Sequence, residues 1–229
     1  MTPRKWDIIK QCAAGAELKM IPVAFIVDSP WIPGYLGLST LDYVTLPAVW
    51  LEANLKVEKE FAEAIFLPGF WFEIGMAAEP SGFGCQVSLY PDRTPAVHPR
   101  ITEVAEMDRL KAPNPLTDGF MPMILNFYRH LEPAVNDAGH AIKMVAARGP
   151  LAVAAHLFGV TNLLQAVKTD PAATHRLLET TTTLTRDWLA AQAAALKEVE
   201  GVLVLDDIAG FLSPRDYLQF AHPYLKRIF

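Results

Sequence analysis

The sequence predicts an α/β protein in which a parallel sheet packs between helices. Three observations lead to this fold class. Apolar runs recur along the chain and are continuous rather than alternating, as expected of strands that are buried on both faces. Longer segments with helix-start signals separate these runs. The last run ends on two carboxylates, Asp206 and Asp207, at the place where α/β proteins build sites from loops.

The strands of the predicted parallel sheet are the four continuous apolar runs. We expect them to lie parallel and adjacent in chain order, because helical segments separate them. The four runs are MIPVAFIV at 20–27, EAIFLP at 63–68, IKMVAA at 142–147 and GVLVLD at 201–206. A fifth segment, GCQVSLYPD at 84–92, alternates more and predicts an outer hairpin. The proline-rich stretch from Pro91 to Pro115 predicts a long excursion, and nothing marks a boundary between domains within 1–229.

Three predicted helices begin with a capping residue followed by proline, which favours a helix start. The starts are Thr2 with Pro3, Asp170 with Pro171, and Ser213 with Pro214. The second helix is predicted to run to about Val199 as a helix of about 28 residues. Its apolar stripe has three-, four- and seven-residue spacing and predicts one buried face. The stripe consists of Leu177, Thr181, Leu184, Trp188 and Ala195.

The composition excludes several classes of protein. The chain has 229 residues, 52% of them hydrophobic and 20% charged, as in an ordinary packed protein. A net charge of −5 with scattered lysines and arginines argues against a nucleic-acid partner. The two cysteines, Cys12 and Cys85, are far apart and favour a reducing compartment. No apolar signal region or membrane span is present in the sequence, so we expect a cytoplasmic protein.

The acidic residues that follow apolar strands are the first candidates for chemistry. Asp206 and Asp207 are placed to orient a ligand, hold a proton or support a metal-bound histidine. The alternative is that one of them caps a turn while the other faces water. Because adjacent residues of a strand point to opposite faces, at most one of the two points into a barrel. Asp28 ends the first apolar run and is a candidate on the same argument.

Two further kinds of residue are candidates near the same edge. His156 follows the Gly149-Pro150 turn and serves either as an acid or ligand contact or as a packed core histidine. The second kind is a group of aromatic residues. They either form a wall for a flat ligand or pack in the core. That group comprises Trp31, Tyr35, Phe70, Trp71 and Phe72.

The end of the chain resembles the uroporphyrinogen decarboxylase superfamily. The resemblance is most specific in DDIAGFLSPRDYLQFAHPYLKRI at 206–228, where an acidic strand end, an Ala-Gly turn and a Ser-Pro helix follow one another. RGPLAVAAHLFG at 148–159, KTDPAATHRLLE at 168–179 and the opening MTPRKWDIIKQCAAGAELKMIPV also match family segments. The resemblance implies a TIM-type (β/α)8 barrel. The chain is expected to hold the first five or so units of that barrel as one domain.

Within the superfamily, the true decarboxylases are the less similar branch. Their arginine-bearing loop after the first strand, which binds substrate carboxylates, corresponds to VDSPW, with Val27 and Trp31 at the arginine positions. Their catalytic aspartate is missing from the Phe66-Leu67-Pro68 segment. A family tyrosine corresponds to His156, and a family serine corresponds to Asp207.

FLPGFWFEIGMAAEPSGFGC at 66–85 is more similar to the methyltransferase branch, and Glu79 lies near an acidic position of that branch. Resemblance to this branch implies methyl transfer between a corrinoid and a thiol, with zinc to activate the thiol. The zinc ligands of the branch are expected beyond Phe229, and neither Cys12 nor Cys85 has a histidine at ligand spacing. The sequence thus implies zinc and corrinoid cofactors by resemblance only.

Three functions stay open at this point. The first is a methyltransferase-like enzyme acting on a small molecule or a corrinoid protein, with catalytic Asp206, Asp207 and His156 and a binding surface of Asp28, Trp31, Phe70 and Glu79. The second is a uroporphyrinogen decarboxylase. The third is a non-catalytic fragment or one half of a split barrel, since a partial barrel leaves an open sheet edge. If the chain is half of a split barrel, we expect it to pair with the missing half or with a second copy.

Overall fold

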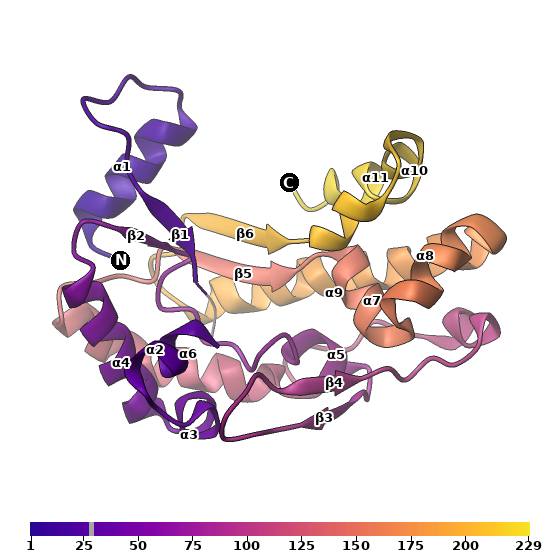
Figure 1. The fold of residues 1–229 in the computed structure, drawn as a ribbon, viewed down its shortest axis with the longest axis horizontal. Helices are drawn as coiled ribbons and strands as arrows, with labels where there is room; N and C mark the ends of the chain where they lie inside the picture. Colours follow the sequence, from indigo (N-terminus) through magenta and orange to yellow (C-terminus); the bar gives the residue numbers. More distant parts are fainter. Residues whose placement is uncertain (28–29) are drawn as a thin grey trace.

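The computed structural model describes residues 1–27 and 30–229. Its helices and strands alternate in the α/β manner that the sequence predicts (Figure 1). In chain order the elements are α1 (Pro3–Ala13), β1 (Ala24–Ile26), α2 (Trp31–Leu36), α3 (Thr40–Thr45), α4 (Pro47–Glu60), β2 (Ile65–Leu67), α5 (Ala78–Gly82), β3 (Gln86–Ser88), β4 (Ala96–His98), η1 (Val104–Arg109), α6 (Met121–Asp137), β5 (Met144–Arg148), α7 (Pro150–Phe158), α8 (Val160–Thr169), α9 (Pro171–Ala195), β6 (Gly201–Leu205), η2 (Asp207–Phe211), α10 (Pro214–Phe220) and α11 (His222–Leu225).

The strands form three separate pairs. β1 and β2 are parallel, with Ala24 opposite Ile65, and β5 and β6 are parallel, with Met144 opposite Gly201. β3 and β4 are antiparallel and form a hairpin. β3 lies within the alternating segment 84–92 that predicted a hairpin, whereas β4 lies beyond that segment, in the proline-rich stretch. The predicted parallel direction of the apolar runs is therefore confirmed within each pair.

The four parallel strands do not make one continuous ladder, contrary to the prediction that they are adjacent in chain order. Among the described residues, no backbone hydrogen bond joins β2 to β5. After β2 the chain turns at Gly69 and Phe70, where φ is 76° and 53°. The N–H of Phe72 then donates to the hydroxyl of Tyr128 on α6 at 3.0 Å. The backbone after β2 is thus held by a helix rather than by β5.

Burial of the strands also departs from the prediction. β5 is buried along most of its length, as a continuous apolar run predicts. β1 is exposed instead, with Phe25 at 52% and Ile26 at 58% exposure. β1 has β2 on one side, and no other described strand pairs with its second edge. The six strands of residues 1–27 and 30–229 do not by themselves close an eight-stranded barrel.

The three predicted helix starts are confirmed, but α9 ends at Ala195 and not near Val199. Thr2 and Ser213 accept hydrogen bonds from the N–H groups of Lys5 and Asp216 at the starts of α1 and α10. α9 has 25 residues, and Asp170 takes its cap position, although its side chain makes no capping hydrogen bond. Four members of the predicted stripe are buried, and Ala195 is partly buried: Leu177, Thr181, Leu184 and Trp188 are at most 2% exposed.

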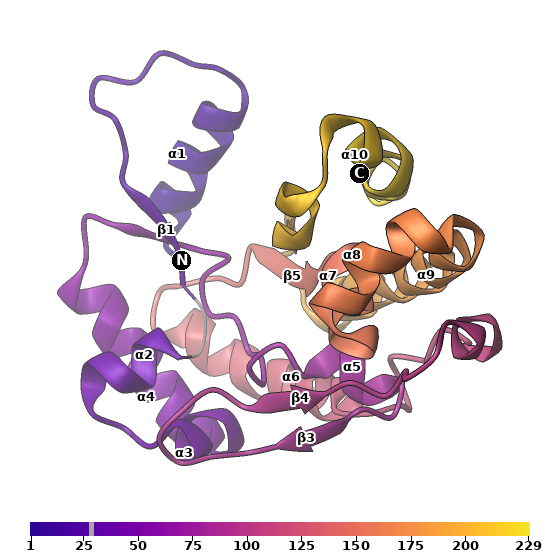
Figure 2. The ribbon, with the colours of Figure 1, turned by 45° about the vertical axis from the view of Figure 1, so that its right-hand side comes forward.

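The core gathers around β5. Helices α6, α7 and α9 contribute its largest group of buried side chains, and α4 adds Trp50. Figure 2 shows α7, α8 and α9 packed together beside β5, while α1 and the loop that follows it stand away from this body. The packing of α7 against α9 fixes the backbone directly after β5, where the candidate site begins.

No single described helix is both long and apolar enough to cross a membrane. α7 and α8 together reach the required length and hydropathy, but they meet at 106°.

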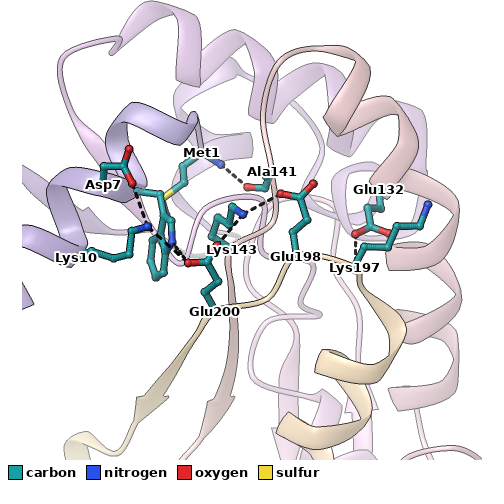
Figure 3. Close-up of polar contacts among 10 residues, drawn as sticks. Met1, Asp7, Lys10, Glu132, Ala141, Lys143, Lys197, Glu198 and Glu200 are labelled. Carbon is teal, nitrogen blue, oxygen red and sulfur yellow. Dashed lines mark hydrogen bonds and ion pairs between the residues drawn. The ribbon is translucent and has the colours of Figure 1, made fainter.

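Polar contacts hold α1 to the N-terminal ends of β5 and β6 (Figure 3). The carboxylate of Glu200 accepts from the indole N–H of Trp6 at 2.7 Å and from Lys143 Nζ at 2.9 Å. These two donors lower the pKa of Glu200 to about 2, the Trp6 hydrogen bond being the larger cause. Lys143 also bonds Glu198 at 2.8 Å, and the amine of Met1 donates to the carbonyl of Ala141. These contacts therefore stabilise the packing of α1 against the N-terminal ends of β5 and β6.

We predict that Glu200→Gln lowers the melting temperature at pH 7 more than Glu198→Gln, because among the described residues Glu198 bonds Lys143 alone, whereas Glu200 also bonds Trp6. A carboxylate whose pKa falls from 4.5 to about 2 on folding stabilises the protein above pH 4.5. This contribution is lost as the pH falls toward 2. The difference in melting temperature between wild type and Glu200→Gln should therefore shrink between pH 5 and pH 2. A difference that does not change with pH would contradict this role.

Candidate functional site

The C-terminal ends of β5 and β6 meet at the start of α7. The carboxylate of Asp206, directly after β6, accepts from the backbone N–H groups of Ala152 at 2.7 Å and Leu151 at 3.3 Å. A carboxylate in this position satisfies free N–H groups of the helix and interacts favourably with its dipole. Gly149 is required here, because a Cβ on it would lie 2.3 Å from the Cβ of Asp206. Asp206 thus ties β6 to the turn after β5.

Burial and hydrogen bonding act on Asp206 in opposite directions. Burial raises the pKa of its carboxyl group to about 6, against the two backbone N–H groups, which lower it, while the nearby charge of Asp207 adds to the increase. At neutral pH the group is mostly ionised but lies close to its titration range. It can therefore exchange a proton near pH 6, in addition to capping α7.

Asp207 and His156 border the same edge. Asp207 opens η2, is exposed, and has no hydrogen-bond or ion-pair partner among the described residues. His156 is half-buried in the last turn of α7. Burial lowers the pKa of His156, the charge of Arg148 lowers it further, and Asp207 opposes both. A neutral imidazole beside an exposed carboxylate is suited to accept a proton or to bond a ligand at neutral pH.

Arg148, the last residue of β5, is the cation at this edge. Its side chain is 9% exposed, and its Nη2 donates to Glu73 Oε2 at 2.8 Å. The guanidinium carbon lies 5.1 Å from the ring centre of Trp71, a cation–π arrangement. The Nε atom is buried and has no hydrogen-bond partner among the described residues. One donor of a buried arginine is thus left over, which is uncommon in a folded protein.

Glu79 completes this cluster beneath the rim. It is 3% exposed, and its Oε1 accepts from the backbone N–H of Arg148 at 2.8 Å. Burial raises the pKa of Glu79, and this outweighs the opposing effect of Arg148. A cavity of about 10 Å³ lies among Glu73, Glu79, Arg148 and Trp71, which is room for about one water. Glu73 is therefore the side chain that pairs with the Arg148 guanidinium, whereas Glu79 is a carboxyl group whose burial favours the neutral form.

Asp206, Asp207 and His156 lie at this edge of the strands, since Asp206 bonds the start of α7 and Asp207 opens η2, which packs on α7. Glu79 lies beneath them, bonded to the backbone of Arg148. The remaining described candidates lie elsewhere. Phe70 is 2% exposed and packs against Trp50, with ring centres 6.1 Å apart.

Trp31 is 40% exposed and stacks on Tyr35 at 5.0 Å. It borders an apolar hollow of about 320 Å³ formed with β1 and β2 residues and Phe61. The expected aromatic wall is therefore divided between the core, this hollow and Arg148. Asp28 lies outside the described residues.

Sequence reasoning missed Arg148 and Glu73 as site residues. The sequence could have predicted Arg148, because it is a charged residue at the end of an apolar run, as Asp206 is at the end of the last run. Glu73 carries no such signal. It lies 75 positions before Arg148, and only folding places the two side chains in contact.

The described residues do not fit a zinc ion. Among residues 1–27 and 30–229, no group of three or more His, Cys, Asp or Glu side chains could hold a metal ion. Cys12 is exposed on α1, whereas Cys85 is buried and burial raises the pKa of its thiol. A thiol with a raised pKa is a poor source of thiolate for metal binding.

The sequence matches the family described as "Uroporphyrinogen decarboxylase (URO-D)" over residues 38–229. The chain belongs to this family, as its motifs predicted. A methyltransferase from Methanosarcina mazei has a similar structure, with a TM-score of 0.74 and 17% sequence identity, over 96% of this chain and 64% of the other. This likeness supports the α/β fold of a barrel-type protein.

Curated relatives carry the name uroporphyrinogen decarboxylase. The protein from Thermodesulfovibrio yellowstonii is 28% identical over 63% of this chain and 42% of its own length. The protein from Nostoc sp. is 25% identical over 82% of this chain and 53% of its own length. The chain therefore spans about half the length of the curated relatives that it matches.

We predict that Asp206→Asn and Asp206→Ala have different effects. Asparagine keeps an oxygen for the N–H groups of α7, whereas alanine removes the cap and should cost about 1 kcal/mol of unfolding free energy at pH 7. An acid whose pKa rises from 3.8 to about 6 on folding stabilises the protein below pH 3.8, and this contribution is lost as the pH rises through about 6. Wild type should thus lose stability relative to Asp206→Asn between pH 4 and pH 7 in urea unfolding. Parallel pH profiles would refute this prediction.

Proposed function

We propose that the protein is an enzyme of the methyltransferase-like branch of the URO-D family. It moves a methyl group between a corrinoid and a thiol or a related acceptor. The charge balance of the rim is the observation that carries this proposal. Among the described residues, the three carboxyl groups of Glu73, Asp206 and Asp207 outnumber Arg148, which is already paired with Glu73. Such a rim suits a ligand that brings no large negative charge to it.

The same charge balance disfavours a substrate with many carboxylates. At the two positions where the decarboxylases are expected to carry arginine, this chain has Val27 and Trp31. Trp31 stacks on Tyr35, and Val27 borders the same apolar hollow. Neither side chain can neutralise a carboxylate, and Arg148 is already paired with Glu73. A tetrapyrrole octa-acid would therefore approach these carboxylates without enough counter-charge.

In the proposed reaction His156 is the proton acceptor. The corrinoid, when bound, would supply the methyl group as a cation equivalent and keep the bonding electron pair, and the thiol sulfur would form the new bond. The thiol proton must then go to a base, and the neutral imidazole of His156 is available at the rim. Asp207 stabilises the imidazolium that forms, since its charge favours protonation of His156.

Uroporphyrinogen decarboxylation is the second candidate. It is favoured by the curated relatives, which carry that name at 24–28% identity. In this candidate, the carboxyl groups of Asp206 at the rim and of Glu79 beneath it would serve as proton donors, since burial raises the pKa of each.

One experiment separates these two candidates. The complete product of the gene is supplied with zinc, methylcobalamin and a thiol, and loss of the methyl–cobalt absorbance is followed. A parallel anaerobic sample receives uroporphyrinogen, and its products are oxidised and separated. We expect methyl transfer without decarboxylation, with at least a tenfold loss of rate in His156→Ala. Decarboxylated products without methyl transfer would reverse the assignment.

A partner at the open edge of β1 is a further proposal. Phe25 and Ile26 are exposed beside an apolar hollow, and Phe211, Leu218 and Phe229 are 63–76% exposed near the other end of the chain. Further β/α units or a second copy would bury such surfaces.

We predict that the isolated chain self-associates and that Ile26→Lys weakens this association, because a lysine cannot be buried there without a partner. Leu116→Lys is the control, since Leu116 is 60% exposed in a loop away from both edges. Sedimentation velocity gives the mass of each variant. A wild-type chain that stays monomeric at all concentrations would rule out association through β1.

A further inference from the structure

A groove of about 970 Å³ lies at the N-terminal ends of the strands, away from the edge that carries Asp206. The first half of α1, the segment 18–23 before β1 and the end of α4 line it, together with Ile65 at the start of β2 and His140 before β5. Figures 1 and 2 show α1 and the loop after it standing away from the rest of the molecule on this side. The groove is therefore separate from the candidate site.

The walls of the groove are apolar and well exposed. Ile21 is 94% exposed, Met20 81% and Val23 53%. Ile8 and Leu55 line the groove from α1 and α4. Apolar side chains gathered in one place mark an interaction site, whereas exposed apolar residues scattered singly need no partner. The groove therefore suits an occupant with an apolar face.

The cations around the groove exceed its acids. Arg4, Lys19 and Lys59 line it and have no ion pair among the described residues, and Glu63 is a lining acid in the same state. This local excess of positive charge occurs in a chain whose net charge is −5. The groove therefore attracts negative charge, although the molecule as a whole repels it.

Lys5 and Glu58 add a buried ion pair to the lining of the groove. Lys5 Nζ lies 2.6 Å from Glu58 Oε2, and the two side chains are 10% and 4% exposed, so their charges cancel. Glu58 Oε1 and His140 Nδ1 are buried and have no hydrogen-bond partner among the described residues. A hydrocarbon chain has no donor or acceptor to offer such atoms, whereas a polypeptide has both. A polypeptide occupant therefore suits the groove better than a lipid chain.

An amphipathic helix matches the size and the charge of the groove. Three turns of α-helix are about 16 Å long and about 10 Å across, so the half that faces a groove fills roughly 600 Å³. The groove has room for this half. Helices that dock in grooves place apolar residues at i, i+3, i+4 and i+7 inside and polar residues at the margins. Acidic residues at these margins would face Arg4, Lys19 and Lys59.

We propose that this groove docks an amphipathic helix of a separate partner polypeptide, whose apolar face is flanked by acidic residues. Met20 and Ile21 contact the apolar face, and Arg4, Lys19 and Lys59 select the acids. This surface lies outside the proposed site of methyl transfer, so it does not depend on that assignment.

Two labelled model peptides test the proposal by fluorescence anisotropy with the purified chain at low ionic strength. Both are amphipathic helices of about five turns with leucine at i, i+3, i+4 and i+7. One carries glutamate beside the leucines, and the other carries lysine there. The acidic peptide should bind at least about tenfold more tightly, because the cations of the groove attract it. The net charge of −5 alone would favour the basic peptide. Added salt should reduce the preference.

Matched variants locate the binding. Lys19→Glu should weaken binding of the acidic peptide about tenfold. Lys111→Glu makes the same charge change in the loop after η1 and should leave binding unchanged. Ile21→Ser should also weaken binding about tenfold, whereas Leu116→Ser should not. All four side chains are exposed, so each variant should fold, and circular dichroism checks this.

The other outcomes overturn the proposal. Equal or tighter binding of the basic peptide, or an equal effect of Lys19→Glu and Lys111→Glu, would show that the groove does not select acids. Binding of dodecanoate without binding of the acidic peptide would indicate a lipid-like occupant. A lower mass of Lys19→Glu in sedimentation velocity, without peptide binding, would indicate a second copy. If the acidic peptide binds the chain but not the complete product of the gene, further units of the same protein cover the groove.

Discussion

The contact between the Asp206 carboxylate and the first N–H groups of α7 sets the geometry of the candidate site. It joins the end of β6 to the turn after β5 at hydrogen-bond distances of 2.7 and 3.3 Å. Only Gly149 separates β5 from α7, and its lack of a side chain lets Asp206 approach. Arg148 ends β5, His156 lies in α7, and Asp207 follows Asp206 at the end of β6. Their mutual placement therefore depends on one carboxylate and one glycine.

The two ends of the strand pair β5–β6 have different roles. At the N-terminal end, Glu200, Lys143 and Trp6 form a network that ties α1 to the strands, and the pKa of Glu200 is lowered. At the C-terminal end, burial raises the pKa values of Asp206 and Glu79, which costs stability at neutral pH. In barrel-type enzymes the sites lie at the C-terminal ends of the strands. Side chains with shifted pKa values are typical of such sites.

The buried pair of Arg148 and Glu73 needs a reason beyond stability. Removing two charges from water costs several kcal/mol for each ion, and their attraction often repays no more than this cost. The pair also leaves Nε without a partner and stacks the guanidinium near Trp71. Such an arrangement is well explained if the arginine is held ready for a ligand.

The sequence by itself determined the elements whose causes are local. Ser213 and Thr2 cap their helices as predicted, and the stripe of α9 is buried, because capping and helical periodicity act over a few residues. The family motifs also identified the URO-D family correctly. The apolar run that contains β1 predicted a buried strand, but β1 is exposed. An apolar strand is buried only where another element covers it.

Tertiary structure alone decided which charges meet. Asp206 was a candidate acid by its position after a strand, but only folding shows that its carboxylate caps α7. Arg148 and Glu73 lie 75 residues apart, and no sequence period connects them. Phe70 and Trp31, grouped by composition, go to the core and to a separate apolar hollow. Periodicity and capping are read within a few residues, whereas pKa values and ion pairs depend on distances across the fold, which only packing sets.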